Sequence, residues 1–261
     1  MTPASLSIFA SRLDAVCEEM GLVLRNAAFS PNIRDRLDFS CAVFDASGQL
    51  CAQAAHIPVH LGSMAFAMRD IVAGREWQPG DQVMLNDPYL GGTHLPDVTL
   101  IAPIFADGRL QAFVVNRAHH ADIGAASPGS MPISSHLDEE GLVIEPTLLV
   151  RGNVIDAEQL RRVTAATRNS AEAGGDFAAQ VAAKTPGLYP VLITSFKCSP
   201  DAFIQDYFKK LMDTHDKPYL VLELDEHDSS VGYETRIEAA VRAFGNHHQA
   251  SAPAHVPDVP R

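Results

Sequence analysis

Positive charge is scarce in this 261-residue chain, which carries 20 lysines and arginines against 32 aspartates and glutamates. The formal net charge of −12 repels nucleic-acid phosphates and anionic lipid, so we expect neither as a partner. Long apolar runs are also missing. The longest uncharged one, Val98 to Ala106, has nine residues, whereas a membrane-spanning helix needs roughly 20. Because the first residues lack the basic start of a signal peptide, the sequence predicts a cytoplasmic protein.

Cysteine is rare as well, with four residues and no Cys-x-x-Cys spacing. This pattern indicates neither a disulfide framework nor a cysteine-rich zinc site, and we expect reduced, mostly buried thiols. The chain also lacks a glycine-rich phosphate loop with a lysine, a Gly-x-Ser-x-Gly elbow and a dinucleotide fingerprint, so we do not expect it to bind ATP itself. Histidine is abundant instead, with 11 residues, several of them close together.

The composition, 46% apolar and 20% charged, is typical of a globular protein. Apolar spacing and turn residues predict an α+β fold, with a mixed sheet and flanking helices. The expected elements are a long helix after Thr2-Pro3, a hairpin of strands 40–44 and 49–53, a helix over 62–72, strands over 83–86, 98–104 and 110–116, and a helix over 156–179.

The chain changes character near residue 185. All five lysines follow residue 183, whereas most arginines precede it, and Pro186, Gly187 and Pro190 mark a boundary. We therefore expect a first domain over 1–184 and a second segment over 185–246. The second segment has a β-α-β-α order, typical of a parallel sheet: strand 191–196, helix 202–212, strand 218–224 and helix 233–244. Residues 247–261 are predicted to be a disordered tail.

Histidines and carboxylates gather at two predicted strand ends. His94 and Asp97 come just before one strand, and His119, His120 and Asp122 follow the next. A short turn joins the two strands, so they should pair antiparallel and bring these ends together. Mixed nitrogen and oxygen ligands suit zinc, manganese or iron. The alternative is that His94 and Asp97 form only a surface hydrogen bond.

Two further groups are candidates for binding a substrate. His56 and His60 are four residues apart, but Pro58 between them argues against the helix that would align them, so hydrogen bonding at a helix N-terminus is an equal alternative. Arg34 and Arg36 could bind an anionic group through their guanidinium forks. They could equally form ion pairs with the neighbouring aspartates.

Several motifs together resemble one family in order along the chain, over about residues 4–183. They are Leu37–Asp45, His56–Met64, Asn86–Val98, Arg117–Gly124, Glu140–Leu142 and Arg168–Asn169. The family is that of hydantoinase B, 5-oxoprolinase and the acetone carboxylase alpha subunit. The resemblance implies ATP-dependent opening of a cyclic amide such as a hydantoin or 5-oxoproline. It also implies a hydantoinase A-like partner subunit that uses the ATP, and hence a hetero-oligomer.

The same resemblance implies roles for particular residues. Acetone carboxylase relatives hold a manganese ion in this subunit, and the positions that match its ligands are His94, Asp97 and His119. We expect phosphorylation of the ring amide oxygen by the partner, followed by attack of water activated by the metal. His120 or Asp122 is the expected general base, and Arg36 is expected to bind the phosphate.

The resemblance stops near residue 183, although family members are considerably longer, so we expect a truncated subunit. From residue 190 the chain resembles the C-terminal end of the activators of 2-hydroxyacyl-CoA dehydratases. Cys198 has no second cysteine nearby in the sequence, so we do not expect an iron–sulfur cluster held by this chain alone. A non-catalytic interaction protein and an accessory protein of acyl-CoA dehydration are the alternative functions.

Overall fold

The computed structural model describes residues 3–54, 57–128, 132–184, 191–194, 219–223 and 230–251. The chain divides into two compact units, Met1–Thr185 and Pro186–Arg261. The boundary between them lies at the position where the lysine distribution and the prolines place a joint. The candidate site lies in the first unit.

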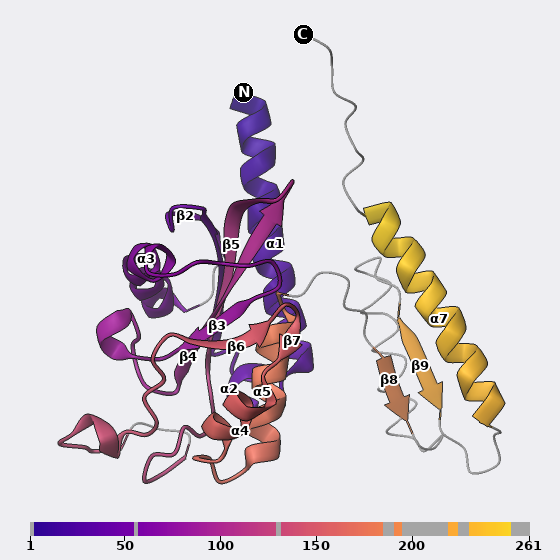
Figure 1. Ribbon diagram of the computed structural model, residues 1–261. Coiled ribbons are helices and arrows are strands. Elements are labelled where there is room, and N and C mark those ends of the chain that lie inside the picture. The colour runs from indigo at the N-terminus through magenta and orange to yellow at the C-terminus, as the bar shows by residue number, and fades with distance from the viewer. Residues whose placement is uncertain are drawn as a thin grey trace. The chain divides into compact units, whose positions relative to one another are not determined.

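The first unit is built on a seven-stranded sheet in the order β2-β1-β5-β4-β3-β6-β7 (Figure 1). Every pairing within it is antiparallel, so the α+β class is confirmed, but the sheet is purely antiparallel and not mixed. The strands are β1 (Phe39–Asp45), β2 (Leu50–Gln53), β3 (Gln82–Leu85), β4 (Asp97–Ala106), β5 (Arg109–His119), β6 (Thr147–Arg151) and β7 (Val154–Ile155). The last two are short and were not expected from the sequence.

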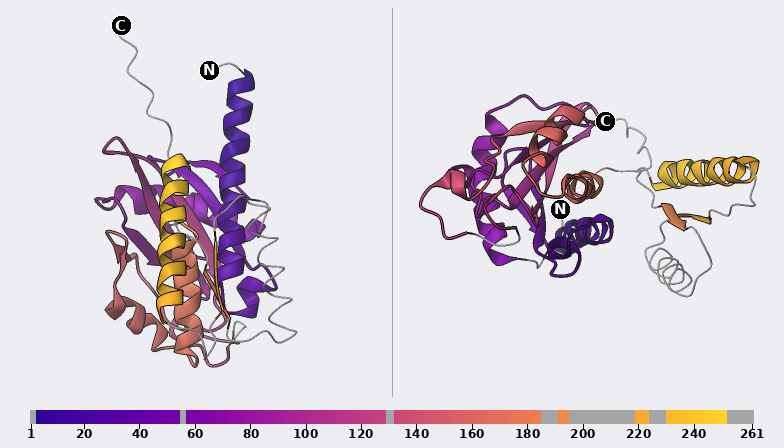
Figure 2. Two further views of the ribbon diagram at one scale, coloured as in Figure 1. Left: turned by 90° about the vertical axis from the view of Figure 1, so that its right-hand side faces the viewer. Right: turned by 90° about the horizontal axis from the view of Figure 1, so that it is seen from below.

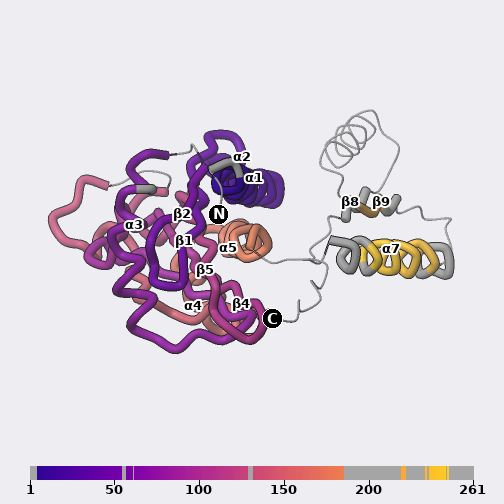
Figure 3. The backbone as a smooth tube through the Cα atoms, turned by 90° about the horizontal axis from the view of Figure 1, so that it is seen from above, coloured from indigo at the N-terminus to yellow at the C-terminus, as the bar shows by residue number. Residues whose placement is uncertain are grey.

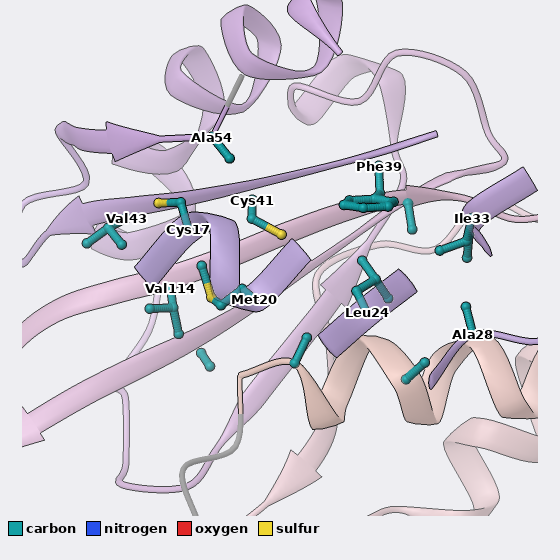
Figure 4. Packing of buried hydrophobic residues seen from close by; sticks show 14 of the residues in the cluster. Cys17, Met20, Leu24, Ala28, Ile33, Phe39, Cys41, Val43, Ala54 and Val114 are labelled. Atoms are coloured by element: carbon teal, nitrogen blue, oxygen red, sulfur yellow. The ribbon is translucent and has the colours of Figure 1, made fainter. Parts of the chain in front are cut away.

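Side chains alternate between the two faces of the sheet, and different helices cover each face. Helices α1 (Pro3–Ala27) and α5 (Ser170–Ala182) lie on one side, and α3 (Pro58–Ala73) lies on the other (Figure 3). Phe39, Cys41 and Val43 of β1 share a buried cluster with Cys17, Met20 and Leu24 of α1 (Figure 4). Ala42 and Phe44, which alternate with them along the strand, pack with Met64 and Met68 of α3.

Helix α1 is longer than the face it covers. Its first turns extend past the sheet (Figure 2), where Leu6 and Phe9 are 58% and 53% exposed. Its C-terminal half supplies the buried side chains of the cluster. The long N-terminal helix expected from the sequence is therefore confirmed, but only part of its apolar stripe is buried.

Two helix boundaries differ from the expectation. Helix α3 begins at Pro58, four residues earlier than predicted, because proline is well tolerated at the first helical position, where its missing N–H is not needed. The single helix expected over 156–179 is two helices, α4 (Ala157–Thr164) and α5. Asn169 separates them, since its side chain accepts a hydrogen bond from the backbone N–H of Glu172 at 3.2 Å and so caps α5.

Three short elements complete the description. The single-turn helices η1 (Pro88–Leu90) and η2 (Leu137–Glu139) and the helix α2 (Pro31–Arg34) lie in connections of the first unit.

In the second unit, β8 (Val191–Thr194) and β9 (Leu220–Glu223) form the expected parallel pair. Helix α7 (Ser230–Ser251) continues past residue 247, where the tail was expected to start. The predicted helix over 202–212 and Cys198 lie outside the described residues. Among the described helices, none combines the length and apolar character needed to cross a membrane.

Candidate metal centre

The candidate site lies at one edge of the sheet, where β4 begins and β5 ends. Asp97, the first residue of β4, is the direct antiparallel partner of His119, the last residue of β5. The strand ends therefore meet as the short turn between them predicts. His94 reaches the same place from the connection between β3 and β4, residues 86–96, which we call the ligand loop.

Asp97 is at the centre of the site and is fully buried. Its Oδ1 lies 2.8 Å from His119 Nδ1 and 3.5 Å from His60 Nε2. Its Oδ2 accepts hydrogen bonds from the hydroxyl of Thr93 and from the backbone N–H of His94, the latter at 3.2 Å. Burial alone would raise the pKa of Asp97, but hydrogen bonds from His119, His60 and Thr93 outweigh it and hold the pKa well below its ordinary value. Asp97 is thus an ionised carboxylate inside the protein.

Three side chains are close enough to share one cation. Ligand atoms of His94, Asp97 and His119 all lie within 4.8 Å of one another. His94 Nδ1 lies 3.4 Å from Asp97 Oδ2, and its side chain is 44% exposed, so the cluster opens to solvent on that side. Two imidazoles and one carboxylate with an open side are a donor set typical of zinc, manganese and iron.

The charge of the cluster fits a divalent ion. The ion-pair partners of Asp97 are the imidazoles of His60, His94 and His119. An imidazole balances a buried carboxylate only when it is protonated, whereas a divalent cation balances it at any pH. Burial lowers the pKa of His119, but the Asp97 carboxylate beside it raises the pKa above its ordinary value overall. The same attraction for positive charge would act on a metal ion.

The ligand loop is fixed by its glycines and by one buried asparagine. Asn86 donates hydrogen bonds to the carbonyl groups of Leu95 at 2.7 Å and Leu142 at 2.9 Å, and so joins the two ends of the loop. Gly91 has a φ of +80°, and a Cβ added there would lie 2.1 Å from the Cβ of Ala67. Glycine is therefore required for the loop to lie this close to α3.

Two residues that border the cluster had a different role, or none, in the sequence analysis. His60 lies in the first turn of α3 and is 2% exposed, so it contacts Asp97 from inside the protein and is not open to a substrate. Asp38 was considered only as an ion-pair partner of the arginines. Its Oδ1 is 3.9 Å from His60 Nε2, its Oδ2 is 4.0 Å from His119 Nδ1, and its side chain is 33% exposed. The sequence carries two weak signals for this position: Asp38 belongs to the Leu37–Asp45 motif, and it lies just before the first predicted strand, which pairs with β5 in the structure.

The structure does not bring His120 to the cluster. Successive residues of an extended chain point to opposite sides, so His120 faces α5 while His119 faces α3. His120 Nε2 lies 2.8 Å from Gln180 Oε1, and its ring packs on Phe177 at 4.4 Å between centroids. It is 1% exposed, and burial lowers its pKa. This location does not match the expected role as a general base.

Asp122 also lies elsewhere. Both of its oxygens lie 3.1 Å from Arg168 Nη1, and Oδ2 also accepts a hydrogen bond from the backbone N–H of Arg168 at 2.8 Å. Burial raises the pKa of Asp122, but these bonds and one from the backbone of Gly124 hold it below its ordinary value. Asp122 therefore joins two connections of the fold and is not directed at the ligands.

The remaining predicted substrate-binding residues differ in position. Arg34 is exposed and forms an ion pair with Asp35 at 3.1 Å, which is the alternative left open by the sequence. Arg36 is exposed, and its positive charge acts to lower the pKa of His119, so Arg36 lies in the neighbourhood of that ligand. His56 lies outside the described residues.

A family model, several proteins of similar sequence and a solved structure all match this chain. A family model described as hydantoinase B/oxoprolinase matches residues 2–216. An uncharacterized protein of Methanocaldococcus jannaschii is 43% identical over 200 residues, and the 5-oxoprolinase of Saccharomyces cerevisiae is 41% identical over 202 residues. The crystal structure of the ATP-dependent caprolactamase from Pseudomonas jessenii has a similar fold, with a TM-score of 0.64, 24% identity and coverage of 99% of this chain.

These matches cover only part of the known proteins. The archaeal and yeast alignments include 74% and 71% of this chain but only 35% and 16% of the relatives' lengths. The superposition covers 40% of the caprolactamase chain. The family match extends to residue 216, so the expectation that the resemblance stops near residue 183 was wrong. The second resemblance, to dehydratase activators, stays a prediction.

Proposed function

Because this chain belongs to the hydantoinase B/oxoprolinase family, we propose that it is part of an enzyme that hydrolyses cyclic amides such as hydantoins or 5-oxoproline. The observation that supports this most directly is the cluster of His94, Asp97 and His119 at the sheet edge, open on one side and bordered by Asp38. Hydrolysis of an amide requires a water molecule to be made nucleophilic and the amide carbon to be made electrophilic.

His94, Asp97 and His119 would hold manganese, zinc or iron. Such an ion lowers the pKa of a bound water and polarises an oxygen of the substrate. The side chains around the ligands have their own tasks. His60 contacts Asp97 from the buried side and fixes the direction of its carboxylate, as partners of metal ligands commonly do.

Asp38 is the residue best placed to accept a proton from the attacking water. It lies beside the ligand His119, and its partial exposure lets it meet both solvent and substrate. A general base must lie within hydrogen-bond reach of the proton that it removes. Asp38, 4.0 Å from His119, is the carboxylate outside the ligand set that lies beside the cluster among the described residues, whereas His120 and Asp122 are engaged elsewhere.

The ATP would be used by a separate hydantoinase A-like subunit. Transfer of a phosphoryl group to the amide oxygen makes the ring carbon electrophilic. Water then adds to that carbon and the ring C–N bond breaks, so that the ring nitrogen takes up a proton and leaves as an amine and an acyl phosphate remains. A second water hydrolyses the acyl phosphate to the carboxylate and inorganic phosphate. Arg36, exposed near the cluster, would bind the phosphoryl group through charge-assisted hydrogen bonds.

The test is ATP-dependent hydrolysis of 5-oxoproline and hydantoin by this chain together with a hydantoinase A-like ATPase subunit. We expect activity only in the mixture, and manganese or another divalent metal in the purified chain by elemental analysis. The double variant His94→Ala, Asp97→Ala should lose the metal, and Asp38→Asn should keep the metal but lose roughly 10²–10⁴-fold in kcat, the usual contribution of a general base. Arg34→Gln, which alters a surface ion pair, is the control.

Metal near zero in the parent chain would remove the metal centre from this proposal. Metal binding without hydrolysis of either ring by the mixture would favour the alternative of a non-catalytic subunit.

A further inference from the structure

Among the described residues, Arg117 is the largest fully buried side chain, and it lies beside the candidate metal centre. It precedes His119 by two residues on β5, so both side chains point to the face of the sheet that α3 covers. Its direct partner across the ladder is Thr99, two residues after Asp97 on β4. Arg117 and Thr99 therefore form the next pair of side chains along the sheet from His119 and Asp97, which are two of the three proposed ligands.

The guanidinium of Arg117 joins three separate elements. Its Nε donates to the hydroxyl of Thr99 at 2.7 Å, one Nη donates to the hydroxyl of Ser63 on α3 at 2.5 Å, and the other donates to the carbonyl of Gly91 at 2.7 Å. Gly91 belongs to the ligand loop. The loop that carries His94 is thus tied to the strands that carry Asp97 and His119.

All three acceptors are neutral, so these contacts form no ion pair. Burial lowers the pKa of Arg117 to about 10, and the Asp97 carboxylate acts in the opposite direction. A buried cation whose acceptors are all neutral costs stability. Its presence here therefore suggests that the geometry of its hydrogen bonds serves another purpose. Arginine differs from lysine in offering a rigid planar fork, which can hold several acceptors in fixed directions.

We propose that Arg117 is the positioning residue of the metal centre: its three-way hydrogen bonding holds the ligand loop against α3 and so sets the distance of His94 from Asp97 and His119. This inference rests on the proposed metal centre and adds a residue that touches neither metal nor substrate. Residues that orient metal ligands typically contribute roughly 10–100-fold in metal affinity.

The charge and the geometry of Arg117 predict opposite changes in metal affinity. A positive charge repels a divalent cation, so a residue acting through charge alone would weaken metal binding, and its removal would strengthen it. A residue acting through its fork would strengthen binding, and its removal would weaken it. Arg117→Lys keeps the charge and loses the fork, whereas Arg117→Met loses both.

The experiment measures the Kd of Mn²⁺ by electron paramagnetic resonance for the full chain and its variants, with the Tm of each metal-free protein. We expect Arg117→Lys and Arg117→Met both to raise the Kd roughly 10–100-fold. Arg168→Lys is the control, since Arg168 also binds carbonyl groups and a carboxylate but lies away from the cluster. We expect its Kd to equal that of the parent, even if its Tm falls.

Each outcome decides between the two proposals. No Mn²⁺ binding by the parent would end the metal centre itself. Binding by the parent with an unchanged or lower Kd in both Arg117 variants would overturn the positioning role alone. An equal rise of the Kd in Arg168→Lys would overturn it as well.

If the Arg117 variants do not fold, Thr99→Val, which removes one acceptor, takes their place. It should raise the Kd roughly tenfold, the lower end of what the loss of one hydrogen bond to a charged group produces, and a Kd equal to that of the parent overturns the inference.

Discussion

Lys184 shows at the scale of one residue how burial changes chemistry. It is 6% exposed, and its Nζ donates to the carbonyl of Gln180 at 2.5 Å near the end of α5. Burial lowers its pKa to about 7, and Cys41 acts in the opposite direction without reversing the shift. In the unfolded chain the pKa of a lysine is about 10.4. Between these two values the unfolded chain binds more protons than the folded one, so stability rises with pH in that window.

We therefore expect the free energy of unfolding to increase from pH 7 toward pH 10 by up to about 1.4 kcal/mol per pH unit through Lys184. Lys184→Met should flatten this slope and stabilise the protein most at or below pH 7, where the parent must bury a charged amine. Urea unfolding at pH 6.5, 8 and 9.5 measures the effect. Arg109→Met, which removes an exposed cation, should leave the slope unchanged, and a parent-like slope in Lys184→Met would contradict the expectation.

His119 and His120 show the same dependence on surroundings. They are adjacent in the sequence, and both were candidates for the site. One faces α3 and meets Asp97, and the other faces α5 and packs on Phe177. The period of two in an extended chain separates them, although the sequence gives no sign of which face holds the site.

At the scale of an element, the ligand loop depends on glycine where it meets α3. In Gly91→Ala the added Cβ would clash with Ala67, and alanine would have to adopt a φ of +80°. We expect a loss of about 1–3 kcal/mol in stability from the strain and the overlap, together with weaker Mn²⁺ binding because the loop must move. Chemical unfolding and metal titration measure the two effects.

Gly108→Ala is a matched control for this variant. Gly108 also has a positive φ, of +70°, but a Cβ added there meets nothing within 4 Å. We expect only the cost of backbone strain, about 1–2 kcal/mol, and no change in Mn²⁺ affinity. Equal losses of affinity in both variants would show that backbone strain, and not the contact with α3, controls the loop.

The start of α5 is a second element with a single controlling residue. Asn169 accepts a hydrogen bond from the N–H of Glu172, and Asn169→Ala should cost about 1 kcal/mol in stability. Asn169→Asp, which keeps the acceptor, should retain most of the stability because aspartate is an equally good N-cap. Thermal unfolding of the two variants checks this, and equal stability in both would contradict the capping role.

For the molecule as a whole, a metal that binds only the folded state should stabilise the first unit. Its ligands come from β4, β5 and the loop between β3 and β4, which are brought together only by folding. At a free Mn²⁺ concentration of 100 times the Kd, we expect a gain of about 2.7 kcal/mol. Thermal unfolding with Mn²⁺ and with a chelator measures it. The double variant His94→Ala, Asp97→Ala should show the same Tm in both conditions.

Local patterns in the sequence are enough to predict the α+β class, the N-terminal helix, the first hairpin and the pairing of β4 with β5, because these follow from apolar spacing and short turns. The sequence also brought His94, Asp97 and His119 together as candidates, since their strands are neighbours along the chain. Tertiary structure alone decided that Asp38 and His60 border the cluster and that His120 does not. Asp38 reaches it through the pairing of β1 with β5, and His60 through the packing of α3 on the sheet. Those contacts join residues far apart in sequence, and they depend on which faces are buried together, a property that no local pattern carries.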